Sequence, residues 1–450
     1  MFRKACIGLA GISFDSAFWG FKESQYKNRI VQLSEIAQKL GLKFIPITKT
    51  FQDYKGAIDA AKKLNDKADL VILDIATYPE GKAAGAFFDT INPPLMLWSR
   101  NETVHKSNIG HNSFCGANFL GGCLALRGQR FRKLYGQPNS KQFKARLQTA
   151  ARLVNAAKMA AGAKIGLFGE GIVPKFYDID IAAKDREKLE KRWKLSFVGV
   201  TTKQLLKTAK SYRDADIEKS AESFTNHFTQ IKIPKDALRK QLRLFRAVKE
   251  ISKRENFSSL AIRCWPELQG LYGTWPCPSI SVLNEIGIPA ACEGDPGGAL
   301  DMLLASKMNK KPSTLMDIID WDEKANTFSI WHCGPTASSW ADKKGAKLIC
   351  HNVDGRTPTD KPAMGLPGVV DMQFKPGKVS VFRTLGAIDD EFAIQGKIAA
   401  APKRKICGSF GVVAEPSIYT DKVDVNFVRQ EIFNRMLPHH YTATGGHIFS

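Results

Sequence analysis

Along the first 310 residues, short apolar segments that predict strands alternate with amphipathic segments that predict helices. This is the order expected of an α/β protein. Short apolar runs at 5–12, 43–46, 68–74 and 94–98 predict strands, and apolar residues at helical spacing in 28–40 and 54–64 predict helices between them. The run Ala68–Asp74 is apolar almost throughout, as expected of a strand covered on both faces. Strands that alternate with helices in this way form a parallel sheet.

The same pattern restarts after a helical stretch at Lys141–Ala161 and changes again after Pro312. Further strands are predicted at 164–168, 195–200, 260–264 and 288–292, with a basic amphipathic helix at 239–254. Beyond Pro312, β-prone runs at 327–331, 346–350, 368–374, 378–385 and 397–400 are separated by Gly, Pro and Asp, which favours antiparallel pairing. We therefore predict two Rossmann-like α/β domains with parallel sheets, 1–155 and 156–310, followed by a mostly antiparallel β domain, 311–450.

Composition places the chain among ordinary globular proteins of a reducing compartment. Its 450 residues are 44% hydrophobic, and no apolar run reaches the eighteen residues that a transmembrane helix needs. The N-terminal apolar segment contains Asp15 and fits a first strand better than a signal peptide. The nine cysteines are scattered, odd in number and without a C-x-x-C pair, so we expect buried thiols, a cytoplasmic location, and neither a zinc ribbon nor an iron–sulfur cluster.

A formal net charge of +22 would attract anions such as nucleic acid, an anionic membrane, or a phosphorylated or sulfonated substrate. The basic residues are spread along the chain and densest between Lys184 and Arg254. No arginine-rich tail, zinc finger or aromatic ribonucleoprotein motif accompanies them, so neither nucleic acid nor membrane is the expected partner. An anionic small-molecule substrate stays open beside the simpler interpretation of a solvated lysine-rich surface.

Acidic residues follow two successive strands of the second predicted sheet. Glu267 lies in RCWPELQ after the strand at 260–264, and Glu293 and Asp295 lie in PAACEGDPGGAL after the strand at 288–292. The carboxyl ends of parallel strands share one edge, where ligands of open α/β sheets bind. The turn FGEG at 168–171 lacks the full G-x-G-x-x-G pattern and indicates only a structural turn.

Histidines occur in two late motifs, WHCG at 331–334 and LPHHYTATGGH at 437–447. Two carboxylates with one or two imidazoles suit a divalent ion such as Mn²⁺. Each residue also has a simpler interpretation. Asp295 would serve as a helix N-cap, His332 as a hydrogen-bonded core residue, and His439 and His440 as surface residues.

Four motifs together resemble the L-fucose/L-arabinose isomerase superfamily, and specifically its compact fucose isomerase-like branch. They are CWPE at 264–267, GIPAACEGD at 287–295, WHCG at 331–334 and HHY at 439–441. Their order and spacing are similar across most of the chain, while residues 1–150 resemble the family only in pattern. The resemblance implies three domains and an aldose–ketose isomerase that uses Mn²⁺, or another divalent cation such as Mg²⁺ or Co²⁺.

The resemblance also implies roles for individual residues. Asp295 matches the second acidic metal ligand and His440 the late histidine ligand. The segment 275–279, where the first acidic ligand is expected, contains no acid, so Glu267 at the preceding strand end is assigned that role. Glu267 and Asp295 are then expected to exchange a proton between C2 and C1 of the open-chain sugar through a cis-enediol intermediate.

Three further residues are expected to bind substrate. His332 resembles an active-site histidine of the arabinose isomerase branch. Trp265 and Trp331 would stack on the apolar face of the sugar, with core packing as the alternative. The sugar would be a 6-deoxyhexose, a pentose or, as the charge suggests, an anionic hexose.

Two other functions remain open, namely a sugar-binding protein without turnover and a related metal-dependent lyase or hydrolase. Family members form closed homo-oligomers, so a trimer or hexamer is expected by analogy. The glycine-rich segment 112–122 would then complete a neighbour's site, although a tight structural turn is the favoured interpretation.

Overall fold

The computed structural model describes residues 5–14, 20–102, 104–105, 108–169, 178–179, 183–219, 221–264, 267–350, 367–384, 392–400 and 407–449. The described residues fall into two compact units, which divide the chain at 155/156 and assign Phe449 to the first unit. The division falls within helix α6, Lys141–Ala160. The three-domain division stays a prediction.

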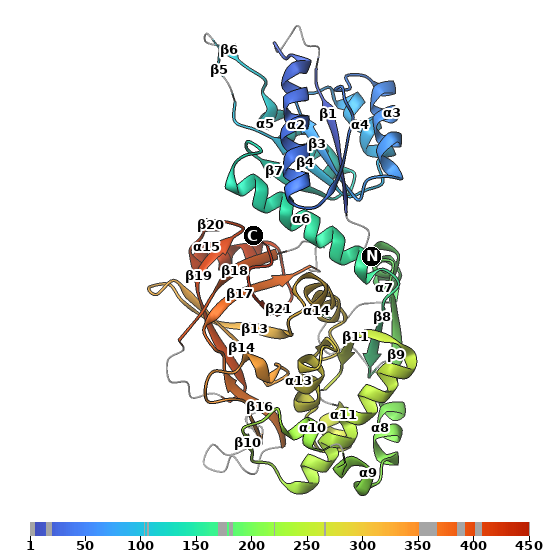
Figure 1. The fold of residues 1–450 in the computed structure, drawn as a ribbon, viewed down its shortest axis with the longest axis vertical. Helices are drawn as coiled ribbons and strands as arrows, with labels where there is room; N and C mark the ends of the chain where they lie inside the picture. The colour runs from blue at the N-terminus through green and yellow to red at the C-terminus, as the bar shows by residue number, and fades with distance from the viewer. Residues whose placement is uncertain are drawn as a thin grey trace. The chain divides into compact units, whose positions relative to one another are not determined.

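The first unit is a parallel sheet between two layers of helices (Figure 1). Its elements are β1 (Cys6–Ile12), α2 (Glu23–Lys39), β2 (Lys43–Pro46), α3 (Tyr54–Asn65), β3 (Leu70–Ile75), α4 (Gly81–Thr90), β4 (Leu95–Ser99), β5 (Val104–His105), β6 (Asn108–Ile109), α5 (Ser113–Leu126), β7 (Phe131–Tyr135) and α6. The strand order is β2-β1-β3-β4-β7, with every neighbouring pair parallel.

Apolar side chains project from both faces of this sheet, as the continuous apolar run in β3 predicts. Helices α3, α4 and α5 pack on one face, where Val71 and Leu73 of β3 are buried. Helices α2 and α6 pack on the other face, over Leu70 and Ile72. Residues one position apart in β3 therefore belong to different cores, because successive side chains of a strand point to opposite faces.

The second unit begins with a smaller parallel sheet of order β12-β11-β8-β9. The elements of this part are β8 (Lys164–Phe168), α7 (Ala183–Trp193), β9 (Ser196–Val200), α8 (Thr202–Ser211), α9 (Asp214–Glu218), α10 (Glu222–Thr225), β10 (Gln230–Ile231), α11 (Lys235–Glu255), β11 (Phe257–Ile262), α12 (Glu267–Tyr272), α13 (Cys277–Glu285), β12 (Ala290–Ala291) and α14 (Pro296–Asn309).

The remainder of the second unit is a ten-stranded sheet, most of whose pairs are antiparallel. Its later elements are β13 (Ser313–Asp322), β14 (Thr327–His332), η1 (Ser338–Trp340), β15 (Lys347–Cys350), β16 (Pro367–Gln373), β17 (Gly377–Arg383), β18 (Phe392–Ala399), β19 (Ser409–Ile418), β20 (Asp421–Lys422), α15 (Val425–Asn434) and β21 (His440–Gly445). Because β18 pairs with both β17 and β19, six strands close a ring in the order β19-β14-β13-β21-β17-β18.

The predicted fold class is confirmed, since parallel α/β sheets are followed by a mostly antiparallel β region. One local prediction is wrong. The glycine-rich segment 112–122 is not a turn but the N-terminal part of helix α5. Among the described residues, no helix combines the length and apolarity needed to cross a membrane.

Candidate active site

Three neighbouring strands of the ring bring polar side chains together. Asp317 of β13 lies opposite His440 of β21 on one side and opposite Trp331 of β14 on the other. The next residue of β14, His332, has its ring centroid 5.4 Å from that of His440. His332 and His440 are both at least 98% buried, with exposed fractions of 2% and 0%. The register of strand pairing therefore brings one carboxyl group and two imidazoles together in the ring of six strands, called the barrel below.

Glu293 reaches the same place from the parallel sheet. It follows β12 in a left-handed conformation, φ 57°, and Gly294 after it has φ 72°. The turn places Glu293 Oε2 3.6 Å from His440 Nε2 and 3.8 Å from His439 Nε2. A left-handed backbone is strained for a residue with a side chain, and such strain concentrates at functional sites.

Three buried atoms of this cluster lack a hydrogen-bond partner in the described part of the chain. They are Asp317 Oδ1, His332 Nε2 and His440 Nε2. His440 Nε2 is 3.8 Å from Asp317 Oδ1. Donor atoms of Glu293, His332 and His440 lie within 4.8 Å of one another, as do those of Asp317, His439 and His440. Unpaired buried polar atoms are costly, so their convergence indicates a ligand outside the chain, and carboxylates with imidazoles fit a divalent cation.

Asp295 orients His440. Its Oδ2 lies 3.2 Å from His440 Nδ1, an arrangement in which Nδ1 donates the hydrogen bond. A neutral imidazole with its proton on Nδ1 has a lone pair on Nε2. Carboxylates commonly fix metal-binding histidines in this way. His440 thus faces the cluster with a lone pair on Nε2.

His332 has the opposite arrangement. The backbone N–H of Cys333 donates to His332 Nδ1 at 2.8 Å, which leaves Nε2 to carry the proton. Burial disfavours a cationic His332, but Cys333, Asp317 and Glu293 outweigh burial and raise its pKa to about 10. Nε2 carries a proton both in the protonated ring and in the neutral tautomer that accepts from the Cys333 amide. His332 therefore presents an N–H to the cluster.

Asp295 itself is fully buried and its oxygens are engaged. Arg383 donates two hydrogen bonds to it, at 2.7 and 3.0 Å, and the N–H of Gly298 donates a third at 2.8 Å. Burial opposes the charged form, but Arg383 and His440 more than offset burial and lower the pKa of Asp295. The carboxylate is the N-cap of α14, as the simpler sequence interpretation proposed.

A second carboxylate–imidazole pair borders the cluster. His439 Nδ1 lies 2.6 Å from Asp178 Oδ2, and the two side chains are 39% and 41% exposed. Burial lowers the pKa of His439, but hydrogen bonding to Glu293 and Asp178 has the larger effect and raises it to about 9. Its ring centroid is 4.1 Å from that of His440, so His439 forms the accessible side of the site.

The structure brings together some of the residues selected from the sequence. Asp295, His332 and His440 share one site, and the metal-ligand roles of Asp295 and His440 stay predictions. Trp331 lies nearly parallel to the His332 ring, with an interplanar angle of 13°, and its indole N–H donates to Cys407 O at 2.7 Å. Its stacking on a sugar stays a prediction. Trp265 lies outside the described residues, and so does the side chain of Glu267, whose backbone begins α12.

Sequence reasoning did not select four residues of this site. Glu293 was noted after the predicted strand at 288–292, but the metal-ligand role was assigned to Asp295. The position of Glu293 directly after that strand was the signal for a site residue. Asp317 was missed because acids interrupt the run STLMDIID, which was not predicted as a strand. Arg383 and Asp178 contribute through contacts remote in sequence, for which no local signal exists.

Comparison with known proteins gives a consistent set of relatives. One, from Alkalicoccus urumqiensis, is 25% identical over 398 residues, 83% of this chain and 80% of the relative. Another, from Clostridium sp. (strain MSTE9), is 26% identical and covers 77% and 76% of the two chains. Both are sulfoquinovose isomerases. The chain is similar to sulfoquinovose isomerases. A third such isomerase, from Priestia aryabhattai, is 23% identical over 75% of the chain.

The other comparisons add little to the sulfoquinovose isomerase similarity. No protein-family model matches the chain. A periplasmic solute-binding protein from Actinobacillus succinogenes 130z with bound D-allose aligns over 68% of this chain and 93% of its own, at 11% identity and a TM-score of 0.19. A score this low does not establish a shared fold.

Proposed function

We propose that this protein is an aldose–ketose isomerase acting on an anionic hexose, with sulfoquinovose as the leading substrate. The observation that carries the proposal is the cluster of Glu293, Asp317, His332 and His440, in which two candidate ligand groups share His440 and three buried polar atoms have no partner among the described residues. Similarity to sulfoquinovose isomerases supports the substrate class. Sulfoquinovose is an aldohexose with a sulfonate on C6, and the net charge of +22 favours attraction of such an anion.

The residues fit a divalent ion, for which we propose Mn²⁺. His440 would hold it through Nε2, together with the two carboxylates near that atom, Glu293 at 3.6 Å and Asp317 at 3.8 Å. Asp295 would support His440 from behind, because Arg383 and Gly298 already occupy its oxygens. This assignment revises the ligand role expected for Asp295. When bound, the ion polarises the sugar carbonyl and stabilises negative charge that develops on oxygen.

The side chains would perform the proton transfer. Isomerisation moves a proton from C2 to C1 of the open-chain aldose, and the hydroxyl proton from O2 to O1, through a cis-enediol. We assign Glu293 and Asp317 to take and return that proton. The Nε2–H of His332 would donate to a sugar oxygen on which charge increases, and such donors are most effective in a buried site.

Sulfoquinovose turnover by the purified protein tests this proposal. We expect Mn²⁺-dependent conversion to the corresponding ketose, observed by NMR, with deuterium from D₂O incorporated at the carbon that receives the proton. Glu293→Gln and Asp317→Asn should abolish turnover. Asp320→Asn, an exposed acid on the same strand as Asp317, should not change it.

A panel of sugars separates the alternatives. Turnover of neutral pentoses or 6-deoxyhexoses in preference to sulfoquinovose would contradict the anionic substrate. Binding of sugar without metal and without turnover would favour a sugar-binding protein. A product that is not an isomer of the substrate would indicate a lyase or hydrolase. The trimeric or hexameric state and the cytoplasmic location stay predictions, the first of which light scattering would test.

A further inference from the structure

Four cysteines from four separate segments meet in the interior of the second unit. Cys264 follows β11, Cys292 follows β12, Cys277 begins α13 and Cys333 follows β14. Their exposed fractions are 1%, 0%, 0% and 8%. Cys264 Sγ is 3.5 Å from Cys292 Sγ, and Cys277 Sγ is 3.6 Å from Cys333 Sγ.

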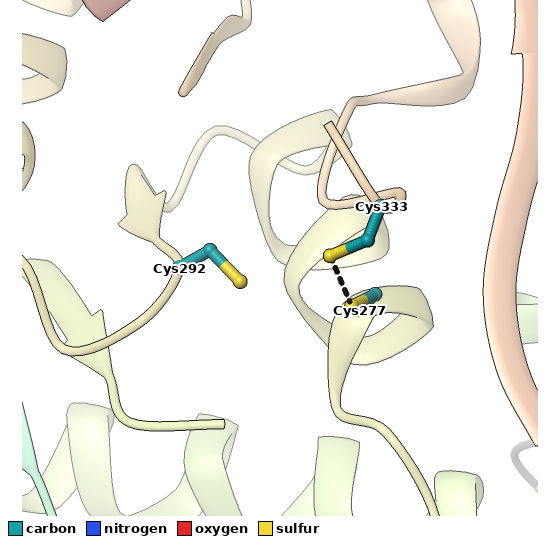
Figure 2. A group of neighbouring side chains, drawn as sticks. All are labelled: Cys277, Cys292 and Cys333. Atoms are coloured by element: carbon teal, nitrogen blue, oxygen red, sulfur yellow. Dashed lines mark hydrogen bonds between the residues drawn. The ribbon is translucent and has the colours of Figure 1, made fainter. Parts of the chain in front are cut away.

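Three of these sulfurs form a compact group. The Sγ atoms of Cys277, Cys292 and Cys333 all lie within 4.8 Å of one another. Figure 2 shows that the Cys292 side chain points toward the Cys277–Cys333 pair, although it comes from a different segment. Cys264, whose Sγ lies 3.5 Å from that of Cys292, is the candidate for a fourth sulfur.

We propose that Cys277, Cys292 and Cys333, with Cys264 as the fourth ligand, form a thiolate site for a soft divalent cation, Zn²⁺ in the first instance. Zinc binds thiolates at about 2.3 Å in a tetrahedron, which places neighbouring sulfurs about 3.8 Å apart. The two short separations, 3.5 and 3.6 Å, are close to that value. The absence of C-x-x-C pairs had argued against such a site, but the ligands come from positions remote in sequence.

A metal accounts for the arrangement better than a disulfide does. One disulfide joins two sulfurs and would leave the third member of the compact group unused. Gly334 continues the turn after Cys333 at φ 130°, and a Cβ there would lie 2.5 Å from Val370 N. The backbone that holds Cys333 is thus tightly constrained.

The thiolate site would differ from the proposed catalytic centre in its donor atoms, and its role would be structural. The catalytic candidates are carboxylate and imidazole donors, which suit Mn²⁺, whereas sulfur donors select zinc-like ions. An ion held by Cys292 of the parallel-sheet region and Cys333 of the barrel would join these two parts. It would also fix the residue after His332, and so would stabilise the active site without touching the sugar.

Metal analysis of the full chain tests this site. After expression with zinc and purification under reducing conditions, we expect about one equivalent of zinc that resists mild chelation. Replacement by Co²⁺ alone should give an intense sulfur-to-cobalt charge-transfer absorption, and X-ray absorption should show metal–sulfur bonds of about 2.3 Å. Cys277→Ser and Cys333→Ser should each remove the charge-transfer band.

Two control variants make the test of the thiolate site independent of the proposed isomerase activity. Cys350→Ser changes a buried cysteine outside the cluster and should keep zinc and the cobalt band. His440→Gln should also keep both, even where the catalytic ion is lost. Wild-type protein that binds neither zinc nor cobalt through sulfur, or that yields a Cys277–Cys333 disulfide on thiol mapping, would overturn the proposal whatever its activity.

Discussion

At the scale of single residues, the site depends on two buried histidines whose protons are fixed in opposite positions. Asp295 accepts from His440 Nδ1 and leaves Nε2 with a lone pair. The Cys333 amide donates to His332 Nδ1 and leaves Nε2 with a proton. Equivalent ring atoms therefore face one cluster as an acceptor and as a donor. In the proposed function, the first imidazole would bind the cation and the second would donate to a sugar oxygen with increasing negative charge.

Substitution of each histidine should separate these roles. His440→Gln should lose the catalytic ion and, with it, activity. His332→Gln should retain the ion but lower kcat about 100-fold, the usual effect of removing one stabilising donor. Metal content and kcat of both variants check this prediction. Equal metal loss in His332→Gln would show instead that His332 is a ligand.

At the scale of elements, the sequence was most informative where a segment is covered on both faces. β1, β3 and β8 were predicted to within two residues at each end because their apolar runs are continuous. β13 and β21 were not predicted. Acids interrupt β13, and the histidines and threonines of β21 do not resemble a core strand. Both strands carry site residues, so the local pattern failed where function replaces apolar side chains with polar ones.

Helix α5 shows a second reason why a prediction from the sequence was wrong. Its glycines were interpreted as turn residues, but they permit close packing within a helix. A Cβ on Gly116 would lie 2.8 Å from Pro79, and one on Gly121 would lie 2.9 Å from Phe131. Close contacts with segments remote in sequence therefore require glycine at these positions. A short stretch of sequence around each glycine does not contain that information.

The junction between α14 and β17 makes stability depend on pH. Asp301 of α14 is fully buried near Arg383 and accepts from the Thr384 hydroxyl and amide. Burial outweighs these partners and raises its pKa to about 7. The unfolded value is about 3.9, so between pH 4 and 7 the folded chain holds the extra proton and stability falls as pH rises, by about 4 kcal/mol in total.

Asp301→Asn should remove most of this dependence. Its side chain is never charged, so the stability of the variant should exceed that of the wild type above pH 7 and approach it near pH 4. Urea unfolding followed from pH 4 to pH 8 measures the difference. Parallel curves for the two proteins would exclude Asp301 as the titrating group.

At the scale of the whole molecule, two units carry separate cores, and the candidate ligands all belong to the second. The first unit contains a buried ion cluster at the carboxyl end of β3. Asp74, with no exposed surface, pairs with Arg29 at 2.6 Å and with Arg100. Both guanidinium groups are nearly buried, so each depends on Asp74 for its counter-charge.

Asp74→Ala should therefore destabilise the first unit by about 3–5 kcal/mol, the usual cost of leaving a buried charge unpaired. The effect should appear as faster proteolysis within residues 20–155. Metal binding by the second unit should persist. Asp59→Ala, which removes an exposed acid from α3, is the matched control and should behave as the wild type. Equal protease resistance of both variants would contradict the prediction.

The order of strands in the barrel has a consequence for synthesis. β21 is the latest of the six ring strands in sequence, yet it lies between β13 and β17, which precede it by more than fifty residues. On the ribosome, β13 and β17 must wait with unpaired edges until 440–445 emerge. The ring closes and His440 meets Asp317 in the same step. The contact between His440 and Asp317 therefore cannot form in a nascent chain until residues 440–445 have emerged, and the unpaired edges of β13 and β17 are prone to aggregation until then.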